Sequence, residues 1–120
     1  MECEIEYTDE FGNWWDEELS EDEQDSVNVY VNLLKARGVK LGFPYSSSIE
    51  SSKHSHMREL RVQYSGKPYR VLYAFDPRRT AILLIGGCKV GNDRWYDEFV
   101  PIADKIYDKH VKNIRKLINK

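Results

Sequence analysis

The second half of the chain alternates apolar and polar positions in the way that β-strands do. Residues 58–64 and 69–75 follow this period of two, and residues 80–86 are apolar on both faces, as expected for a central strand. Two segments rich in turn-forming residues, 65–68 and 76–79, separate the three runs. The pattern therefore predicts three consecutive antiparallel strands joined by short turns.

The first half of the chain predicts a short strand at residues 4–7 and two helices after it. In the first helix, apolar side chains recur at helical spacing, at Phe11, Trp14, Trp15 and Leu19. The second helix begins with a capping box at Ser20 and Glu23, in which each side chain accepts a hydrogen bond from the other residue's backbone N–H. Gly38 is suited to end this helix.

The rest of the chain contains an irregular segment and a further helical one. The serine-rich stretch 46–52 is expected to be a mobile loop. The helical period returns from Trp95 onward, but Pro101 fits the first turn of a helix better than its middle. We therefore expect a turn or short helix at residues 93–100, followed by a long helix that ends at about residue 117.

The expected order of elements is β-α-α-β-β-β-α, an α+β architecture in which an antiparallel meander packs against helices. The 120 residues suit a single domain, 1–120. Hydrophobic residues make up 41% of the chain, which is enough for one core. Both helical regions are expected to pack on the sheet face that carries Val62 and Val71.

Composition argues against several classes of protein. The longest apolar run, Ala81–Ile85, is far shorter than the roughly 20 residues that span a bilayer. The acidic N-terminus lacks the basic-then-apolar order of a secretory signal. Cys3 and Cys88 lie far apart and form no metal-binding spacing. We therefore expect a reduced, cytoplasmic protein without a membrane segment, a metal or a cofactor.

Charge is distributed unevenly along the chain. Residues 1–50 contain 13 acidic and three basic residues, for a net charge of -10, whereas residues 51–120 contain seven acidic and 15 basic residues, for +8. A basic half within a protein of net charge -2 is compatible with a polyanionic partner such as a nucleic acid. The alternative is that the two halves pair with each other, or that solvated helix faces carry the charges.

Two arginines are expected to lie close together on one face of the sheet. If the first turn takes four residues, Gln63 opposes Arg70, and Arg61 becomes its diagonal neighbour at roughly 7–8 Å between backbones. Two cations this close repel each other unless an anion lies between them, and a phosphate or a carboxylate would serve. Glu59, Asp76 or the acidic helices could instead neutralise them. On an exposed face, Arg70→Ala is expected to reduce activity with little loss of stability.

Two further segments carry residues suited to a polyanion. Lys89 follows the glycine pair 86–87, which is expected to end the last strand and which permits close approach of a ligand to the backbone. The segment 94–96, Arg-Trp-Tyr, opens the last helical region, and an aromatic ring beside cations is a platform for a single-stranded base. The alternative for Trp95 is packing in the core.

The histidines offer a weaker indication of chemistry. His54 and His56 alternate ahead of the strands and could act as acid and base, or simply lie on a loop surface. No third ligand has a recognisable spacing, which argues against a metal site. His110 falls on the apolar side of the last helix and is expected to be structural. Cys88 has no evident base partner, so covalent catalysis has little support.

The stretches Met57–Val62 (MRELRV) and Tyr69–Asp76 (YRVLYAFD), together with the following strand and Lys89, resemble the RelE/HigB toxin superfamily. The resemblance is closest to the branch called phage-derived Gp49-like. It implies the toxin of a type II toxin–antitoxin pair. Many members enter the ribosome and cut mRNA there without metal, by attack of the ribose 2′-OH on the adjacent phosphate.

The resemblance also implies site residues. Carried over by motif, Arg61, Arg70, Lys89 and Tyr96 match the catalytic positions. The candidate RNA contacts are Lys53, His54, His56, Arg58, Arg94 and Trp95. Two features depart from better-known members: the protein is mildly acidic, and Glu59 stands where some relatives have a second lysine. His54 or His56 could then supply the base.

Two other functions remain open at the level of sequence. The first is a non-enzymatic toxin, like the ParE toxins that share this fold and inhibit DNA gyrase; the second is a domesticated phage protein that only binds a partner. The expected partners are an antitoxin of helix-turn-helix type, the ribosome and mRNA. The antitoxin could cover the cationic face, or it could bind the aromatic first helix around Trp14 and Trp15.

Overall fold

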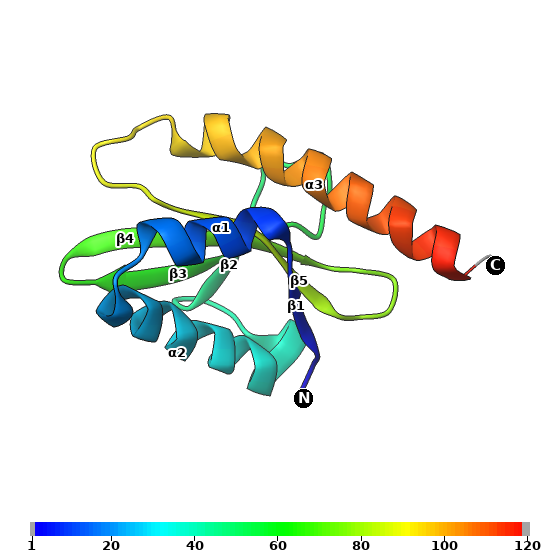
Figure 1. Ribbon diagram of the computed structural model, residues 1–120, viewed down its shortest axis with the longest axis horizontal. Coiled ribbons are helices and arrows are strands. Elements are labelled where there is room, and N and C mark those ends of the chain that lie inside the picture. The colour runs from blue at the N-terminus through cyan, green and yellow to red at the C-terminus, as the bar shows by residue number, and fades with distance from the viewer. Residues whose placement is uncertain (1, 119–120) are drawn as a thin grey trace.

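The computed structural model describes residues 2–118, which form a five-stranded sheet with helices on both of its faces (Figure 1). The elements, in chain order, are β1 (Ile5–Tyr7), α1 (Asp9–Glu18), α2 (Glu21–Arg37), the 3-10 turn η1 (Gly38–Lys40), β2 (Ser46–Ser48), β3 (Arg58–Tyr64), β4 (Lys67–Phe75), β5 (Ala81–Cys88) and α3 (Trp95–Ile118). The expected α+β class and order are confirmed, with β2 as an additional strand, and the architecture is compatible with a RelE-like fold.

The sheet has the strand order β1-β5-β4-β3-β2, so β4 lies at its centre. The meander β3–β4–β5 is antiparallel as predicted, and β1 pairs with β5 in parallel. The expectation of a mobile loop at residues 46–52 is wrong for Ser46–Ser48, which pair with β3. Each of these serines has a hydrogen-bond partner on another strand: Tyr73 on β4, and Glu59 and Arg58 on β3, respectively. A serine-rich segment can therefore serve as an edge strand here.

The β3–β4 hairpin closes through a two-residue turn rather than the expected four-residue one. Ser65 and Gly66 both have positive φ, 53° and 77°, which matches the favoured type I′ hairpin turn. Lys67 and Pro68 therefore belong to β4, and Arg61 lies directly opposite Arg70. The register differs from the expected one by two positions. Because side chains alternate with a period of two, both arginines still share one face.

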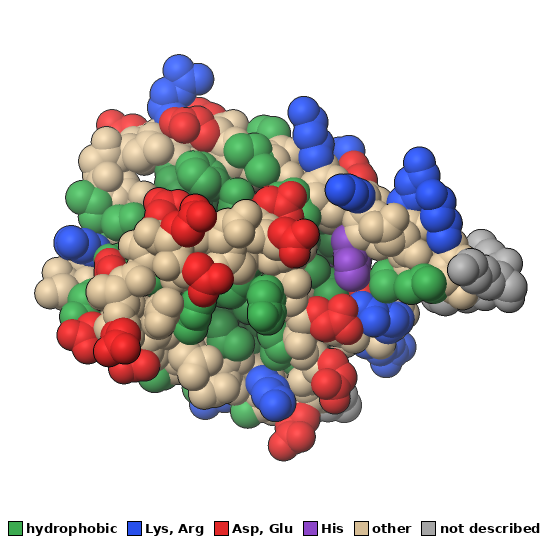
Figure 2. Space-filling view, viewed as in Figure 1, with side chains coloured by type: hydrophobic (Ala, Val, Ile, Leu, Met, Phe, Trp, Pro, Cys, Tyr) green, Lys and Arg blue, Asp and Glu red, His purple; other side chains and the backbone are tan. Residues whose placement is uncertain are grey.

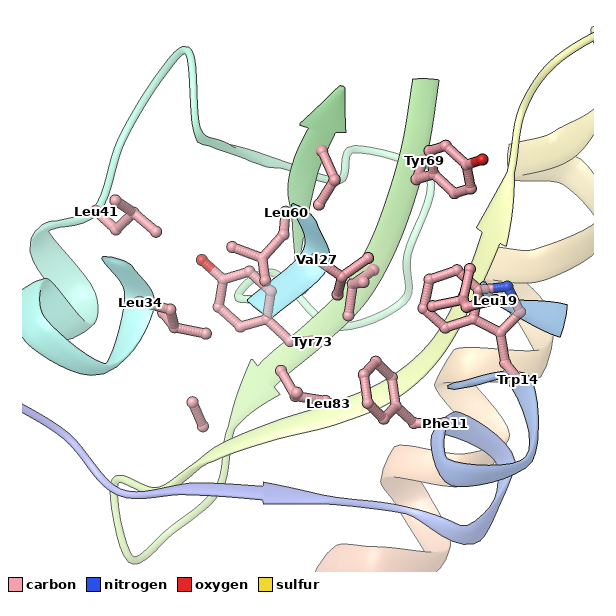
Figure 3. Packing of buried hydrophobic residues seen from close by; sticks show 13 residues of the cluster. Phe11, Trp14, Leu19, Val27, Leu34, Leu41, Leu60, Tyr69, Tyr73 and Leu83 are labelled. Carbon is pink, nitrogen blue, oxygen red and sulfur yellow. The ribbon is translucent and has the colours of Figure 1, made fainter. Parts of the chain in front are cut away.

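The two faces of the sheet have separate cores. The helices α1 and α2 cover the face of Val62 and Val71, where the core shown in Figure 3 includes Phe11, Trp14, Val27, Leu34 and Tyr73. The expectation that α3 joins them is wrong, because α3 packs on the opposite face, against Leu72, Ala74, Ile82 and Leu84. The central strands β4 and β5 are apolar on both faces, and each face requires its own helical cover.

Two adjacent glycines in β5 admit one tryptophan on each face of the sheet. A Cβ atom at Gly86 would lie 2.3 Å from the Trp14 ring, and one at Gly87 would lie 2.6 Å from Trp95 Nε1. The strand continues through this pair to Cys88 instead of ending there. The glycines thus permit close packing of α1 and α3, and Trp14 is a core residue rather than an exposed anchor.

The helix α3 runs without interruption from Trp95 to Ile118, although Pro101 lies inside it. The expected break is wrong. Pro101 is on the exposed side, so the backbone carbonyl one turn earlier, which loses its N–H partner, is on the side that faces water. The last turns of α3 extend beyond the sheet (Figure 1). Among the described residues, no helix combines the length and the apolar character needed to cross a membrane.

Asp76, at the end of β4, connects the β4–β5 turn to α3. Its buried carboxylate accepts hydrogen bonds from the backbone N–H groups of Arg78 and Thr80, from the Arg78 guanidinium, and from His110 Nε2 at 2.9 Å. Burial alone would raise the pKa of Asp76, but the hydrogen bonds from His110 and Arg78 outweigh burial and hold it below the ordinary value. The structural role expected for His110 agrees with this contact.

Asp76→Asn is expected to lower the free energy of unfolding by about 2 kcal/mol or more at neutral pH, because the amide keeps a single acceptor oxygen for several donors. The ionised carboxylate stabilises the fold above the ordinary aspartate pKa of 3.8, and this contribution is lost as the pH falls through the lowered folded-state value. Urea unfolding of the wild type and the variant should therefore converge as the pH drops below about 4. Asp93→Asn, at an exposed position, is the control and should change little. A difference that stays constant with pH would contradict this role.

Candidate functional site

Three cations converge on the sheet face that α3 covers. Arg61 on β3 and Arg70 on β4 are directly opposed, not diagonal as expected. Lys89 follows β5, and its backbone N–H donates to the Pro68 carbonyl at 2.8 Å, which holds it beside β4. These residues line an open cleft of about 330 Å³, whose walls are Phe43, Pro44, Arg61, Gln63, Pro68, Arg70 and Lys89. The sequence-predicted cations Arg61, Arg70 and Lys89 thus meet at one site.

Glu59 is the buried counter-ion of this cluster, with a side chain that is 5% exposed. Its Oε2 atom accepts hydrogen bonds from Ser47 at 2.7 Å and from Arg61 at 3.1 Å. Its Oε1 atom lies 3.3 Å from Arg70 Nε. One carboxylate therefore faces three cations, and the cluster keeps an excess of positive charge. Neutralisation by Glu59, one of the alternatives for the arginine pair, is thus partial.

Tyr96, in the first turn of α3, contacts the Glu59 carboxylate from the helix that covers this face of the sheet. Its hydroxyl donates to Glu59 Oε1 at 2.6 Å and accepts a hydrogen bond from Lys89 Nζ at 3.3 Å. The Lys89 ammonium also lies 4.6 Å from the centre of the Tyr96 ring, within the range of a cation–π contact. Lys89, Tyr96 and Glu59 therefore form a continuous hydrogen-bonded chain from the cleft into the protein.

Burial and neighbouring charges shift two pKa values at this site. Burial, and then the charge of Arg70, lower the pKa of Lys89, although Glu59 partly opposes this. Burial, and then the hydrogen bond to Glu59, raise the pKa of Tyr96, so its hydroxyl keeps its proton. A lysine whose pKa is lowered gives up a proton more readily near neutral pH. The site can therefore bind an anion and also supply a proton.

His54 and His56 lie at a different place, against the middle of α3. His54 Nε2 is 2.8 Å from Asp108, which also pairs with Lys53. The Tyr107 hydroxyl donates to the Phe75 carbonyl, so His56 Nε2, at 3.0 Å from that hydroxyl, is the donor to it. Burial, followed by the charge of His54, lowers the pKa of His56.

Tyr107 is 11 residues after Tyr96, or roughly 16 Å along the helix, since each residue advances it by 1.5 Å. The histidines are thus held away from the cationic cleft, and neither is placed to act as a base there. Lys53, which shares the contact with Asp108, is likewise remote from Arg61, Arg70 and Lys89.

The other predicted RNA contacts also lie outside the cleft lining. Arg58 donates to Ser46, Ser48 and the Leu41 carbonyl, and so anchors β2. Arg94 is exposed, 3.8 Å from Asp97. Trp95 is 1% exposed and stacks on Phe99, with ring centres 4.6 Å apart. A ring buried in this way cannot present a face to a base, so the core-packing alternative for Trp95 agrees with the structure.

Sequence reasoning missed Phe43 as a cleft residue and the contact of Glu59 with Tyr96. The alternation of side chains did place Glu59 on the face of Arg61, where it was one candidate counter-ion. Phe43 lies in an irregular loop, where no periodicity indicates which way a side chain points. Within the described part of the chain, no group of three or more His, Cys, Asp or Glu side chains is arranged to hold a metal ion.

The surface around the site reflects the uneven charge of the sequence. Figure 2 shows Asp and Glu side chains spread over the face formed by α1 and α2, and Lys and Arg side chains along the second half of α3. On this face the acidic side chains of α1 and α2 form a solvated surface, and among the described ion pairs the contact of Arg78 with Glu6 joins the two halves.

Comparison with known proteins places the chain in a family. Residues 14–108, a segment that contains the three cations, Glu59 and Tyr96, match the family described as phage derived protein Gp49-like (DUF891). A protein of Mycobacterium tuberculosis named "Putative toxin HigB3" is 45% identical over 92 residues, which cover 76% of this chain and 79% of that protein. A second, "Putative toxin HigB2" of the same organism, is 35% identical over 99 residues, or 81% of this chain and 49% of that protein.

The chain therefore belongs to the phage-derived Gp49-like family, among toxins of the HigB type. This confirms the family expected from the motifs around Arg61 and Arg70. The chain spans most of the first relative and about half the length of the second.

Proposed function

We propose that this protein is the toxin of a toxin–antitoxin pair, and that it cleaves mRNA on the ribosome in the cationic cleft, without metal. Its family, and relatives named as HigB toxins, support the first part. The observation that carries the second is the directly opposed pair Arg61 and Arg70, joined by Lys89 and Tyr96 around an open cleft.

In this mechanism the arginines bind the phosphate whose bond is cut. An Arg guanidinium matches the geometry of phosphate oxygens, and several cations stabilise the negative charge that grows in the transition state. Glu59 is a positioning residue. Both of its oxygens already contact protein donors, so it orients Arg61, Arg70 and Tyr96 and has no free oxygen for the substrate.

Lys89 fits the role of general acid. The 2′-hydroxyl of the ribose gives its proton to a solvent water and its oxygen forms a bond to phosphorus, while the bond from phosphorus to the 5′-oxygen of the next nucleotide breaks. That 5′-oxygen leaves more easily if it receives a proton, and the lowered pKa of Lys89 suits its ammonium group to the transfer. Tyr96 holds Lys89 through its hydroxyl and its ring.

The cleft also suits an antitoxin. Its excess of positive charge would attract an acidic segment, which would block RNA at the same time. The alternative docking place, the aromatic first helix, loses Trp14, which is 5% exposed and packed in the core. Trp15 remains partly accessible there. We therefore favour the cleft, and a helix-turn-helix antitoxin remains the expected partner.

Lys89→Met is expected to lower mRNA cleavage by on the order of 100-fold, because it removes a cation and proton donor while retaining apolar packing against the Tyr96 ring. The measurement is induced expression in cells, with separate readouts of translation rate, mRNA 5′ ends and plasmid supercoiling. Tyr96→Phe, which keeps the ring, should give a smaller loss. Lys105→Met, at an exposed position of α3, is the control and should cleave like the wild type.

The outcomes of this experiment distinguish mRNA cleavage from gyrase inhibition and test the role of Lys89. Arrested translation with new mRNA ends supports the proposal. Loss of supercoiling with intact mRNA would contradict it and favour gyrase inhibition. Unchanged cleavage by Lys89→Met, at matched protein levels, would remove Lys89 from the mechanism.

A further inference from the structure

We propose that Phe43 is a nucleobase-stacking residue, which holds a base of single-stranded RNA next to the phosphate bound in the cationic cleft. The inference rests on the proposed function and adds a binding residue to it. Phe43 belongs to the loop between η1 and β2, and its neighbour Pro44 lines the same cleft.

The exposure of Phe43 has no explanation in the packing of the fold. Its side chain belongs to neither core cluster, and the residue is 75% exposed, more than any other large hydrophobic residue among those described. A phenylalanine of this exposure leaves much of its apolar surface in water, which is unfavourable unless a ligand covers it. Exposed single hydrophobic residues are common, so the exposure alone leaves the ring free for a ligand, and its contact with the cations gives the reason to propose one.

One contact of the ring ties it to the cations. The Arg61 guanidinium carbon lies 5.2 Å from the ring centre, so the ring stands beside a group that also faces Glu59 and Arg70. A ligand that satisfies both features needs an anion for Arg61 and a flat, apolar surface for Phe43. A nucleotide has both, because its phosphate and its base are joined through one sugar.

Phe43 is the one aromatic side chain in the described cleft lining. The aromatic rings nearby are not free to stack on a base. The Trp95 ring is buried against Gly87 and Phe99. The Tyr96 ring faces Lys89, and its hydroxyl is bound to Glu59. Stacking on Phe43 would accept any base, since every base has a flat π-face. It would position the RNA strand without selecting its sequence.

The test is binding of a short single-stranded RNA to the purified protein, measured by fluorescence anisotropy at low salt. The RNA carries 2′-O-methyl groups so that it cannot be cut. Phe43→Ala should weaken binding by roughly 10-fold, which is the usual value of one base–aromatic stack. Phe43→Trp should restore binding, and Phe43→Leu, which is apolar without a π-face, should not. All three should keep the wild-type urea midpoint, since the residue is exposed.

Two controls make the result specific. Tyr7→Ala removes an exposed aromatic residue on β1, at the opposite edge of the sheet, and should bind RNA like the wild type. An RNA of abasic nucleotides keeps the phosphates and removes the bases. With that RNA, Phe43→Ala and the wild type should bind equally.

Three results would overturn the inference: no binding of RNA by the wild type at low salt, an equal loss for Phe43→Ala with abasic RNA, or a loss of antitoxin binding without a loss of RNA binding. The last would make Phe43 a protein contact. Failure of the proposed function is seen separately, as toxicity in cells without mRNA cleavage. A wild type that binds RNA and cleaves mRNA, with a Phe43→Ala variant that binds equally well, rejects the stacking role alone.

Discussion

Arg70→Ala should lower the free energy of unfolding by about 3–5 kcal/mol, in addition to removing activity. The mild effect expected from sequence assumed an exposed arginine, but the Arg70 side chain is 7% exposed and lies against Glu59, which is itself buried. Removing one member of a buried ion pair leaves a charge with too few partners. Because small domains unfold with a total of about 5–15 kcal/mol, this loss alone could abolish folding at 37 °C. The measurement is urea unfolding of the purified variant.

A double-mutant cycle separates loss of folding from loss of chemistry. Arg70→Met keeps the aliphatic bulk of the side chain, and Glu59→Gln removes the opposing charge. Each alone should destabilise, whereas the double variant should recover about 2 kcal/mol relative to their sum, because neither member of the Arg70–Glu59 pair is then left as a buried charge without the other. Additive effects would show that the two side chains do not interact. The Lys89 ammonium has no direct ion pair with a buried carboxylate. The free energy of unfolding of Lys89→Met should therefore stay within about 1 kcal/mol of the wild-type value.

Gly86→Ala should destabilise the protein by about 3 kcal/mol or more. The added Cβ would lie 2.3 Å from the Trp14 ring, a distance that the packed core cannot accommodate without moving α1. Thermal or urea unfolding measures the change. Gly12→Ala is the matched control: its Cβ would lie 3.5 Å from Tyr7, an ordinary contact, in the middle of α1. That variant should gain about 0.5–1 kcal/mol, because alanine favours a helix more than glycine does.

The double variant Gly86→Ala, Trp14→Leu tests the cause. If the clash with the indole is responsible, the smaller leucine relieves it, and the two changes together should cost less than the sum of each alone by at least about 1 kcal/mol. Strict additivity would point to a different cause, such as a change in the strand backbone itself.

Local patterns predicted the elements that are local in origin. The meander follows from alternation within 58–64 and 69–75, and the start of α2 from the capping box of Ser20 and Glu23, in which both hydrogen bonds form. The strand at Ser46–Ser48 could not be predicted from local sequence, because its hydroxyl groups form hydrogen bonds with residues on other strands. The face on which α3 packs depends on how two helical layers share one sheet, which no single segment specifies.

The candidate site shows the same division. That Arg61 and Arg70 share a face could be predicted, because two-residue and four-residue turns give the same parity and a three-residue turn would place Val62 on the face of Arg70. The contact between Tyr96 and Glu59 could not, because it joins residues 37 positions apart in different layers. The sequence motif Arg-Trp-Tyr left Trp95 open between a platform for a base and packing in the core. A helix presents neighbouring residues in different directions, and here Trp95 points into the core and Tyr96 toward Lys89 and Glu59.

The glycine pair of β5 also has a consequence for how this family can diverge. Trp14 and Trp95 press on opposite sides of two consecutive residues, so only the thickness of one strand separates the two indoles. Tyr96, which holds Lys89, is the next residue after one of them. A larger residue at either glycine requires a smaller residue in place of the facing tryptophan. Loss of either tryptophan would leave a cavity in the core on its side of the sheet. The four positions therefore form two glycine–tryptophan pairs, and a lasting substitution at one position requires a compensating change at its partner.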